Sequence, residues 1–352
     1  MVSAIPFKIL WNMGALEAGK KMNKLPLKKR IPLWPPLFYF SFLPAGILLF
    51  IFWEQLRSAE FILLLQGYRS PAADFFFRAF TFLGDDLFFL LFFCIMFWCF
   101  DRGTAFSAGA LLLFSGVCSN LIKEFTALPR PIIEGVTPPS GYSFPSGHAL
   151  TAVALWGYLA VKIKKAWFWG WAITAIALIS FSRLFLGFHF AGDVLGGLLI
   201  GLVLLAVFLW VERLLPARII GLNLGKSASG GLARTLLPFV FLLAAFFSIF
   251  IFPGRGLPRI LGLLAGGYLG YILGEGKILS PPPKGLLHRR LINIFIGLSG
   301  LFVLFYLCGE FWNRPCRFFS PLSFLSYVLT GLWITFLAPL IFNRLSRGDS
   351  RQ

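Results

Sequence analysis

Charged and metal-binding side chains are scarce in this chain of 352 residues. Charged residues make up only 13% of it, and there are 14 acidic residues, 3 histidines and 5 cysteines. A soluble protein of this length would need more charge to cover its surface. No Cys/His spacing typical of a zinc site occurs either. The shortages therefore exclude an ordinary soluble domain and a structural zinc centre.

Apolar residues make up most of the chain. They account for 58% of the chain, including 43 Phe, and the mean hydropathy is +0.82. Apolar runs close to the roughly 20 residues that cross a bilayer predict an all-α, polytopic membrane helix bundle. Ten spans are expected, at about residues 37–53, 84–100, 104–122, 148–161, 167–182, 193–211, 235–252, 260–274, 291–308 and 321–342.

The distribution of cations predicts the orientation. With the N-terminus inside, 22 of the 32 Lys and Arg lie in segments on that side, as the positive-inside trend requires. Both termini are then cytoplasmic, and residues 1–36 form a basic cytoplasmic segment with no signal peptide. The net charge of +18 follows from topology and contact with anionic membrane lipids. It is not the clustered basic face of a nucleic-acid-binding protein.

Two further features have open interpretations. Residues 54–86 mix charges with apolar stretches too short to span, which predicts interfacial helices on the outer leaflet, forming either a substrate vestibule or a structural collar. Cys94, Cys99 and Cys118 lie within predicted spans. Cys308 and Cys316 flank an outer loop and could form a disulfide if that side is oxidising.

Two polar clusters interrupt the apolar chain at the predicted outer face. Lys123 ends one span and Arg130 follows in an extended, proline-flanked loop. In the second cluster, Ser146 is a natural N-cap, Gly147 allows close approach of the backbone, and His148 stands beside the free amides of a helix start, a ready anion site. Taken singly, each residue could be an ordinary interfacial or capping side chain.

A third cluster lies between the next two spans. His189 and Asp193 are four residues apart, so the carboxylate can hold the imidazole in one tautomer. Arg183 offers a guanidinium for bidentate phosphate contact. Three cations and two histidines at one membrane face indicate a site that holds a phosphate and attacks its phosphorus.

These clusters together resemble the three-part signature of the type-2 phosphatidic acid phosphatase and vanadium haloperoxidase superfamily. The matching segments are Lys123-x6-Arg130-Pro131, Pro145-Ser146-Gly147-His148 and Ser182-Arg183-x5-His189-x3-Asp193. The resemblance implies a six-helix membrane core, about residues 37–211, with its site at the outer face. Residues 212–352 then form about four additional C-terminal transmembrane helices.

The resemblance also implies residue roles. His189 would attack phosphorus to form a phosphohistidine, Asp193 would orient it, and His148 would act as general acid and then general base. The phosphoryl oxygens would be held by Lys123, Arg130, Arg183, Ser146 and Gly147.

The function expected is dephosphorylation of a lipid phosphate without metal or other cofactor, because three cations and helix-start amides can neutralise the phosphoryl group. A phosphotransferase using the same intermediate, or a phosphatase for a small ester such as glucose-6-phosphate, remains as an alternative. A haloperoxidase and a non-catalytic lipid transporter or scaffold are further alternatives. Which lipid is the substrate stays open.

The last four spans carry no ionisable residue, which argues against a coupled transporter. Gly262, Gly266, Gly270 and Gly274 recur at a spacing of four and form a small-residue stripe. The stripe would serve packing within the chain or a homodimer seam. The additional spans are reminiscent of the sphingosine-1-phosphate phosphatase and glucose-6-phosphatase branches.

Overall fold

The computed structural model describes residues 34–214, 243, 257–274, 287–312 and 320–349. Within these residues the chain is helical and contains no strand. The helices of the motif-bearing part are α2 (Trp34–Ile51), α3 (Trp53–Leu56), α4 (Glu60–Gln66), α5 (Pro71–Phe82), α6 (Asp86–Cys99), α7 (Arg102–Thr126), α8 (Gly147–Ala152), η1 (Val153–Gly157), α9 (Tyr158–Ile163), α10 (Ala166–Phe185) and α11 (Ala191–Leu214). The C-terminal helices are α13 (Leu257–Gly274), α14 (Leu287–Trp312), α15 (Ser320–Leu332), η2 (Trp333–Leu337) and α16 (Ala338–Asp349).

The chain divides into two compact units, Met1–Pro44 and Ala45–Gln352. The described residues of the first unit are the N-terminal part of α2. All contacts reported below lie within the second unit.

Five described helices are long and apolar enough to cross a membrane, at Arg102–Thr126, Ala166–Phe185, Ala191–Arg213, Leu287–Leu307 and Phe324–Leu345. Shorter apolar helices cover Phe42–Ile51, Gly147–Ile163 and Arg259–Gly274. The protein is therefore a multi-pass integral membrane protein, with fewer full-length spans than the ten expected. The expected span at 235–252 falls outside the described residues except for position 243.

Part of the segment expected to lie on the membrane surface forms a bent pair with the helix that follows it. Helices α5 and α6 together satisfy the length and composition of one span, with a bend of 49° between them. Ser70 caps α5 by accepting a hydrogen bond from the Ala73 amide at 3.2 Å, and Pro71 occupies the first turn, where its missing amide costs nothing. The helices α3 and α4 are too short to span.

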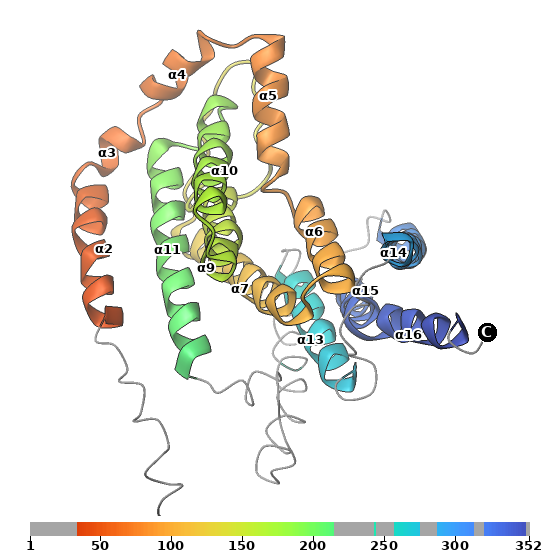
Figure 1. The fold of residues 1–352 in the computed structure, drawn as a ribbon. Coiled ribbons are helices and arrows are strands. Elements are labelled where there is room, and N and C mark those ends of the chain that lie inside the picture. The colour runs from red at the N-terminus through yellow and green to blue at the C-terminus, as the bar shows by residue number, and fades with distance from the viewer. Residues whose placement is uncertain (1–33, 215–242, 244–256, 275–286, 313–319, 350–352) are drawn as a thin grey trace, which may run out of the picture. The chain divides into compact units, whose positions relative to one another are not determined.

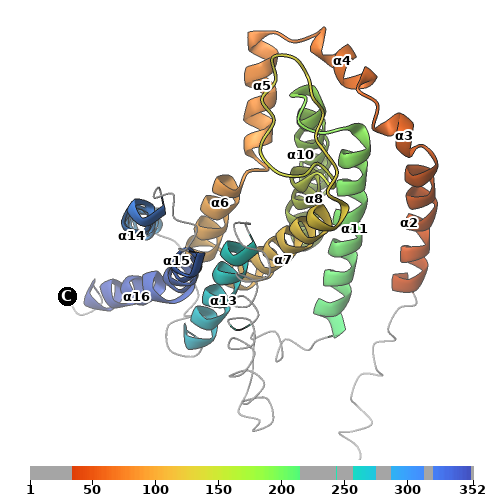
Figure 2. The same ribbon diagram turned by 180° about the vertical axis from the view of Figure 1, so that it is seen from behind.

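Close contact between α8 and α11 brings the second and third motifs together. A Cβ at Gly197 would lie 2.6 Å from the Ser146 carbonyl oxygen, and one at Gly201 would lie 2.8 Å from the Leu150 carbonyl oxygen. Only glycine at these positions lets the two backbones approach so closely. Helix α11 runs beside α10 in Figure 1, and in the view from behind α8 lies beside α11 (Figure 2).

The glycine stripe of α13 packs against α15 of the same chain. A Cβ at Gly262 would meet the Phe324 carbonyl oxygen at 2.8 Å, and Gly266 and Gly270 are equally crowded by Val328 and Thr335. These three glycines therefore serve packing within the chain, and the stripe does not offer a free seam for a second copy.

The C-terminal helices attach to the motif-bearing part through one hydrophobic cluster. Its buried residues include Trp98 of α6, Phe106 of α7, Tyr271 of α13 and Ile334 of η2. The Trp98 indole donates a hydrogen bond to the Ile334 carbonyl at 2.9 Å. This cluster therefore packs α6 and α7 of the motif-bearing part against α13 and η2.

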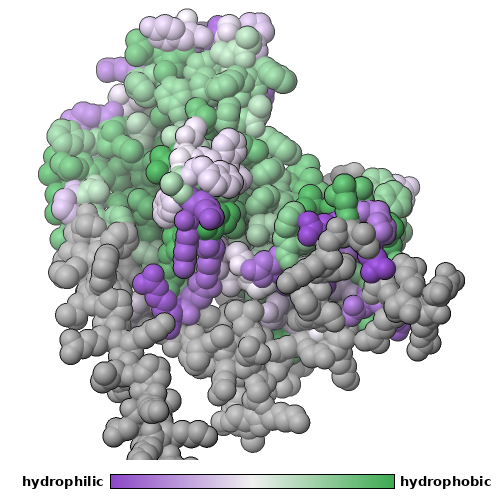
Figure 3. Space-filling view, viewed as in Figure 1, coloured by the Kyte–Doolittle hydropathy of each residue, from purple (hydrophilic) through white to green (hydrophobic). Residues whose placement is uncertain are grey.

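Hydrophobic residues dominate the visible surface of the described part (Figure 3). Phe75 is 77% exposed and Phe302 is 72% exposed, as expected for side chains that face lipid. Cys94 and Cys99 are buried free thiols, in keeping with their expected place in spans. The side chains of Cys308 and Cys316 lie outside the described residues.

Candidate active site

His189 lies in the short loop between α10 and α11, and its side chain is 2% exposed. Its Nδ1 is 3.6 Å from Oδ2 of Asp193, which stands in the first turn of α11 and is fully buried. Gly187 has a φ of +71°, a left-handed conformation that lets the chain turn between the helices. The i, i+4 pairing expected from the sequence is therefore present.

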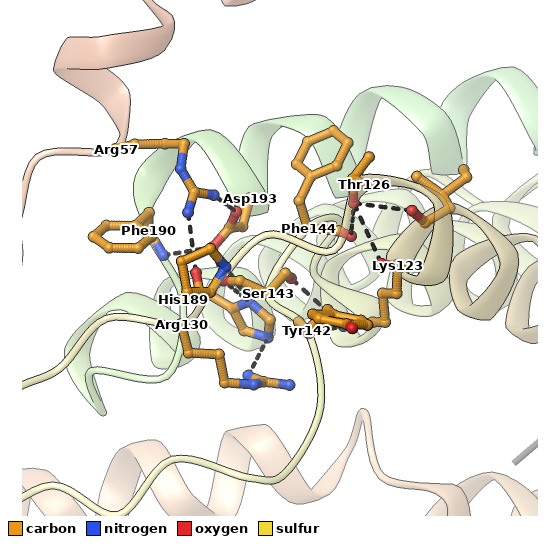
Figure 4. A network of polar contacts seen from close by, with 12 residues as sticks. Arg57, Lys123, Thr126, Arg130, Tyr142, Ser143, Phe144, His189, Phe190 and Asp193 are labelled. Carbon is orange, nitrogen blue, oxygen red and sulfur yellow. Dashed lines mark hydrogen bonds and ion pairs between the residues drawn. The ribbon is translucent and has the colours of Figure 1, made fainter. Parts of the chain in front are cut away.

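The contacts of His189 define its tautomer. Arg130 Nη1 lies 3.1 Å from His189 Nε2 and can only donate, so Nε2 must carry the lone pair. The proton then sits on Nδ1, which faces Asp193 and, at 3.5 Å, the hydroxyl of Ser143. Ser143 in turn donates a short hydrogen bond to Asp193 Oδ2. In Figure 4, His189 lies between Arg130 and the Asp193 carboxylate.

Arg130 and Lys123 are held by backbone carbonyl groups around the same loop. Arg130 donates to the carbonyls of Gly141 at 3.0 Å and Phe188 at 2.9 Å. Lys123, at the end of α7, donates to the Tyr142 carbonyl at 2.9 Å (Figure 4). Neither cation is paired with a carboxylate by these contacts, so both positive charges are available to an anion.

Ser146 differs from the sequence expectation. It occupies the N-cap position of α8, but its hydroxyl makes no capping hydrogen bond, and its backbone amide donates to the Asp193 carbonyl at 2.9 Å. Among the described residues, Ser146 Oγ and Arg183 Nε are buried polar atoms without a hydrogen-bond partner. Buried donors of this kind normally have a partner, and phosphate oxygens would provide one.

His148 and Arg183 contact the junction of α5 and α6. His148 Nε2 lies 2.8 Å from Asp85 Oδ1, and Arg183 donates a short hydrogen bond to the hydroxyl of Thr81. Arg183 also interacts electrostatically with both His148 and His189. It therefore links the two histidines, which otherwise have separate sets of partners.

Burial and nearby charge lower the pKa of His189 to about 3, well below its ordinary value of 6.5. Burial is the main cause, and the positive charges of Arg130, Arg183 and Lys123 add to it, while the hydrogen bond to Asp193 opposes it. Burial likewise lowers the pKa of Arg130. His189 is therefore neutral at physiological pH, as a nucleophile must be.

Three residues of this network were not singled out from the sequence. Ser143 bridges Asp193 and His189, Asp85 pairs with His148, and Arg57 forms an ion pair with Asp193. Arg57 had been placed in the interfacial segment. A signal existed for it, since a cation on the side expected to be outer departs from the positive-inside trend in the same way as Lys123 and Arg130 do.

The described residues contain no group of three or more His, Cys, Asp or Glu that could hold a metal ion. The carboxylates near the two histidines, Asp85 and Asp193, are each engaged with an imidazole. The polar groups that face the site are mainly cations and donors, which suit an anion.

Comparison with known proteins matches residues 104–215 to the PAP2 superfamily, and residues 258–350 to the PAP2 superfamily phosphatase, transmembrane extension. Lipid phosphate phosphatase delta of Arabidopsis thaliana is 28% identical over 46% of this chain and 43% of its own length. Sphingosine-1-phosphate phosphatase 1 of Mus musculus is 25% identical over 75% of this chain and 70% of its own length. The chain thus spans less than half the length of the plant relative.

One solved structure, of a transmembrane PAP2 type phosphatidylglycerolphosphate phosphatase from Bacillus subtilis, is similar with a TM-score of 0.44 and 23% identity. The similarity covers 52% of this chain and 97% of that one.

Proposed function

Because the chain carries a PAP2 superfamily domain followed by that family's transmembrane extension, we propose that it is a membrane enzyme that hydrolyses a lipid phosphate monoester through a phosphohistidine intermediate. The observation that carries the proposal is the neutral, buried His189, whose Nε2 lone pair faces Arg130 while Nδ1 faces Asp193. The three predicted motifs all lie within the matched domain.

In the first step, Nε2 of His189 attacks phosphorus and the bond from phosphorus to the lipid oxygen breaks. His148 gives a proton to the departing oxygen. Asp193 accepts from Nδ1–H of His189 and stabilises the positive charge that forms on the ring as the N–P bond is made.

In the second step, a water molecule loses a proton to His148 and attacks the phosphohistidine. Inorganic phosphate leaves, and His189 regains its lone pair. Asp85 accepts from the Nε2 side of His148, which leaves Nδ1 of that ring to exchange the proton.

The phosphoryl oxygens are held by Lys123, Arg130 and Arg183, with Ser146 and Gly147 at the start of the helix that runs to Ile163. Phosphoryl transfer needs chiefly positioning and neutralisation of charge, so these groups can replace a metal. The unpartnered Ser146 hydroxyl and Arg183 Nε support this assignment.

The site faces the exterior of a cytoplasmic-type membrane, with both termini inside, in accordance with the cation distribution. Candidate substrates are phosphatidic acid, a long-chain-base phosphate, phosphatidylglycerol phosphate and an isoprenyl pyrophosphate. A long-chain-base phosphate is the first to test, because the mouse relative that aligns with most of this chain is named for sphingosine-1-phosphate.

The test is release of inorganic phosphate by the detergent-purified protein, with EDTA present, from each candidate lipid and from glucose-6-phosphate. We expect release from a lipid phosphate that is lost in His189→Ala. A folded wild-type protein that releases phosphate from none of these compounds would contradict the proposal. Transfer of the phosphate to an added alcohol, with little release to water, would favour a phosphotransferase.

A further inference from the structure

Arg57 follows the short helix α3 and directs its side chain at the catalytic carboxylate. Its Nη1 donates to Asp193 Oδ1 at 2.7 Å, and its Nη2 donates to the Pro129 carbonyl at 3.0 Å. The side chain is 12% exposed and that of Asp193 is fully buried. In Figure 4, Arg57 approaches the carboxylate on the side away from Arg130.

Aromatic contacts fix the guanidinium in place. It lies 4.6 Å from the ring centroid of Phe190 and 5.4 Å from that of Trp53, within the range of cation–π attraction. Trp53 itself packs edge-to-face against Phe144 at 5.3 Å. The Cβ of Leu56 and the Cγ of Arg57 would lie 3.4 and 3.5 Å from a Cβ at Gly192, so the segment packs closely against the start of α11.

These contacts reach a loop of every motif. Pro129 precedes Arg130 of the first motif, Phe144 precedes the Pro145-Ser146-Gly147-His148 motif, and Phe190 follows His189 of the third. Trp53 and Arg57 therefore join the three loops to a segment that lies outside the signature.

The two oxygens of Asp193 have separate partners. Oδ1 accepts from Arg57, whereas Oδ2 accepts from Ser143 and from the Phe190 amide and faces His189 Nδ1. A carboxylate engaged at both oxygens cannot rotate. Without Arg57, the Asp193 carboxylate would lose an ion pair at 2.7 Å, and a buried charge left without its counterion is costly.

We propose that Arg57 is a positioning residue for phosphoryl transfer: it fixes the plane of the Asp193 carboxylate so that Oδ2 holds His189 with its Nε2 lone pair directed at phosphorus. The inference rests on the proposed function. Arg57 acts through Asp193 and contacts neither phosphorus nor the leaving oxygen. It also links the start of the interfacial segment, residues 54–86, to the nucleophile.

The test compares Arg57→Ala and Arg57→Lys with the wild type in the phosphate-release assay. For Arg57→Ala we expect kcat to fall about 10- to 100-fold, as when other groups that orient a catalytic side chain are removed. KM should stay within about threefold, because the phosphate-binding cations are intact. Lysine can restore the ion pair but not both hydrogen bonds, so Arg57→Lys should recover part of the rate.

Arg69→Ala is the matched control. Arg69 belongs to the same interfacial segment and forms an ion pair with Asp74 at 2.8 Å, away from the catalytic carboxylate. We expect this variant to keep wild-type kcat and KM, which separates a loss of orientation from a general loosening of the segment.

The effect of added guanidinium on kcat distinguishes a positioning role of Arg57 from a purely structural one. At low concentration it should occupy the space left in Arg57→Ala and raise kcat, whereas an equal concentration of urea should not. It should give no increase with Arg69→Ala or the wild type.

The inference is overturned if Arg57→Ala and Arg57→Lys, purified as folded protein, keep the wild-type kcat while His189→Ala is inactive; the proposed function would then still stand. It is also overturned if Arg57→Ala and Arg69→Ala lose activity equally and guanidinium restores neither. An inactive, folded wild-type protein would instead contradict the proposed function, and the inference with it.

Discussion

Helix α11 in the motif-bearing part and helix α13 in the C-terminal part both present glycines to a neighbouring helix. Gly197 lies against the Ser146 carbonyl and Gly262 against the Phe324 carbonyl, and a Cβ would meet the two oxygens at 2.6 and 2.8 Å. The packing is nearly the same, but what it brings together differs. Beside Gly197 lie the second and third motifs, whereas Gly262 packs against Phe324 and Tyr327.

Buried polar groups show the same contrast. In the described motif-bearing part they include Arg183, His189 and Asp193, whose partners lie on other segments. In the described C-terminal helices they are uncharged, and Thr330 and Thr335 donate to carbonyls of their own helix one turn earlier. The motif-bearing part keeps charged groups buried, which costs stability. The C-terminal helices bury uncharged polar groups and have no place in the proposed mechanism.

The largest expected effect comes from comparing one histidine of each region. His148→Ala should lower kcat about 10²- to 10⁴-fold, because a general acid and base is removed. His288, exposed at the start of α14, has no place in the proposed mechanism, and His288→Ala should keep wild-type activity. Steady-state phosphate release by the two variants checks this. Equal losses would mean that His148 acts through folding instead of proton transfer.

A smaller effect is expected from alanine at the matched glycines. Gly197→Ala and Gly262→Ala should each destabilise the protein by about 1–3 kcal/mol through overpacking, measured by thermal unfolding in detergent. Gly197→Ala should also lower kcat about 10- to 100-fold, because a shift of the Ser146 backbone misplaces the site.

The folded fraction of Gly262→Ala should keep the wild-type kcat. The comparison between the two regions fails if both variants lose kcat alike, or if Gly197→Ala loses only stability.

The smallest effect concerns acid. The pKa of His189 is about 3 in the folded protein and near 6.5 when unfolded, so between these values the unfolded state binds the additional proton. Stability is unaffected at pH 7 and falls as the pH drops below 6.5, by about 2 kcal/mol at pH 5. His189→Gln should lack this loss, and the exposed His288→Gln should retain it.

Unfolding of the three proteins at pH 7 and pH 5 measures the difference. Equal acid sensitivity of His189→Gln and the wild type would show that His189 is not held neutral by its surroundings.

Much of the fold could be predicted because a bilayer demands long apolar helices, and nine of the ten apolar segments are helical in the described residues. The bent pair of α5 and α6 was not predicted, because the charges among residues 54–86 indicate helices that lie on the membrane surface. The family predicted from the three motifs is confirmed by the matches to the PAP2 superfamily and its transmembrane extension.

Contacts between residues close in sequence could be predicted, whereas contacts between distant residues could not. The i, i+4 spacing of His189 and Asp193 is a local signal, and the pair is present. Arg57 is 136 positions from Asp193, so nothing in the sequence around either residue indicates their pairing. The sequence places Ser146 at a helix start. The direction of its hydroxyl depends on the neighbouring helices, and the hydroxyl makes no capping hydrogen bond.

The most direct test of the central claim is to trap the phosphoenzyme. The protein carrying His148→Ala, which has lost the base that activates water against the intermediate, is incubated with lipid substrate labelled in its phosphate and quenched in alkali, where phosphohistidine survives. The account predicts a covalent label that maps to His189 and is absent from the double variant His148→Ala, His189→Ala. A label on another residue, or substrate turnover by His189→Ala itself, would contradict it.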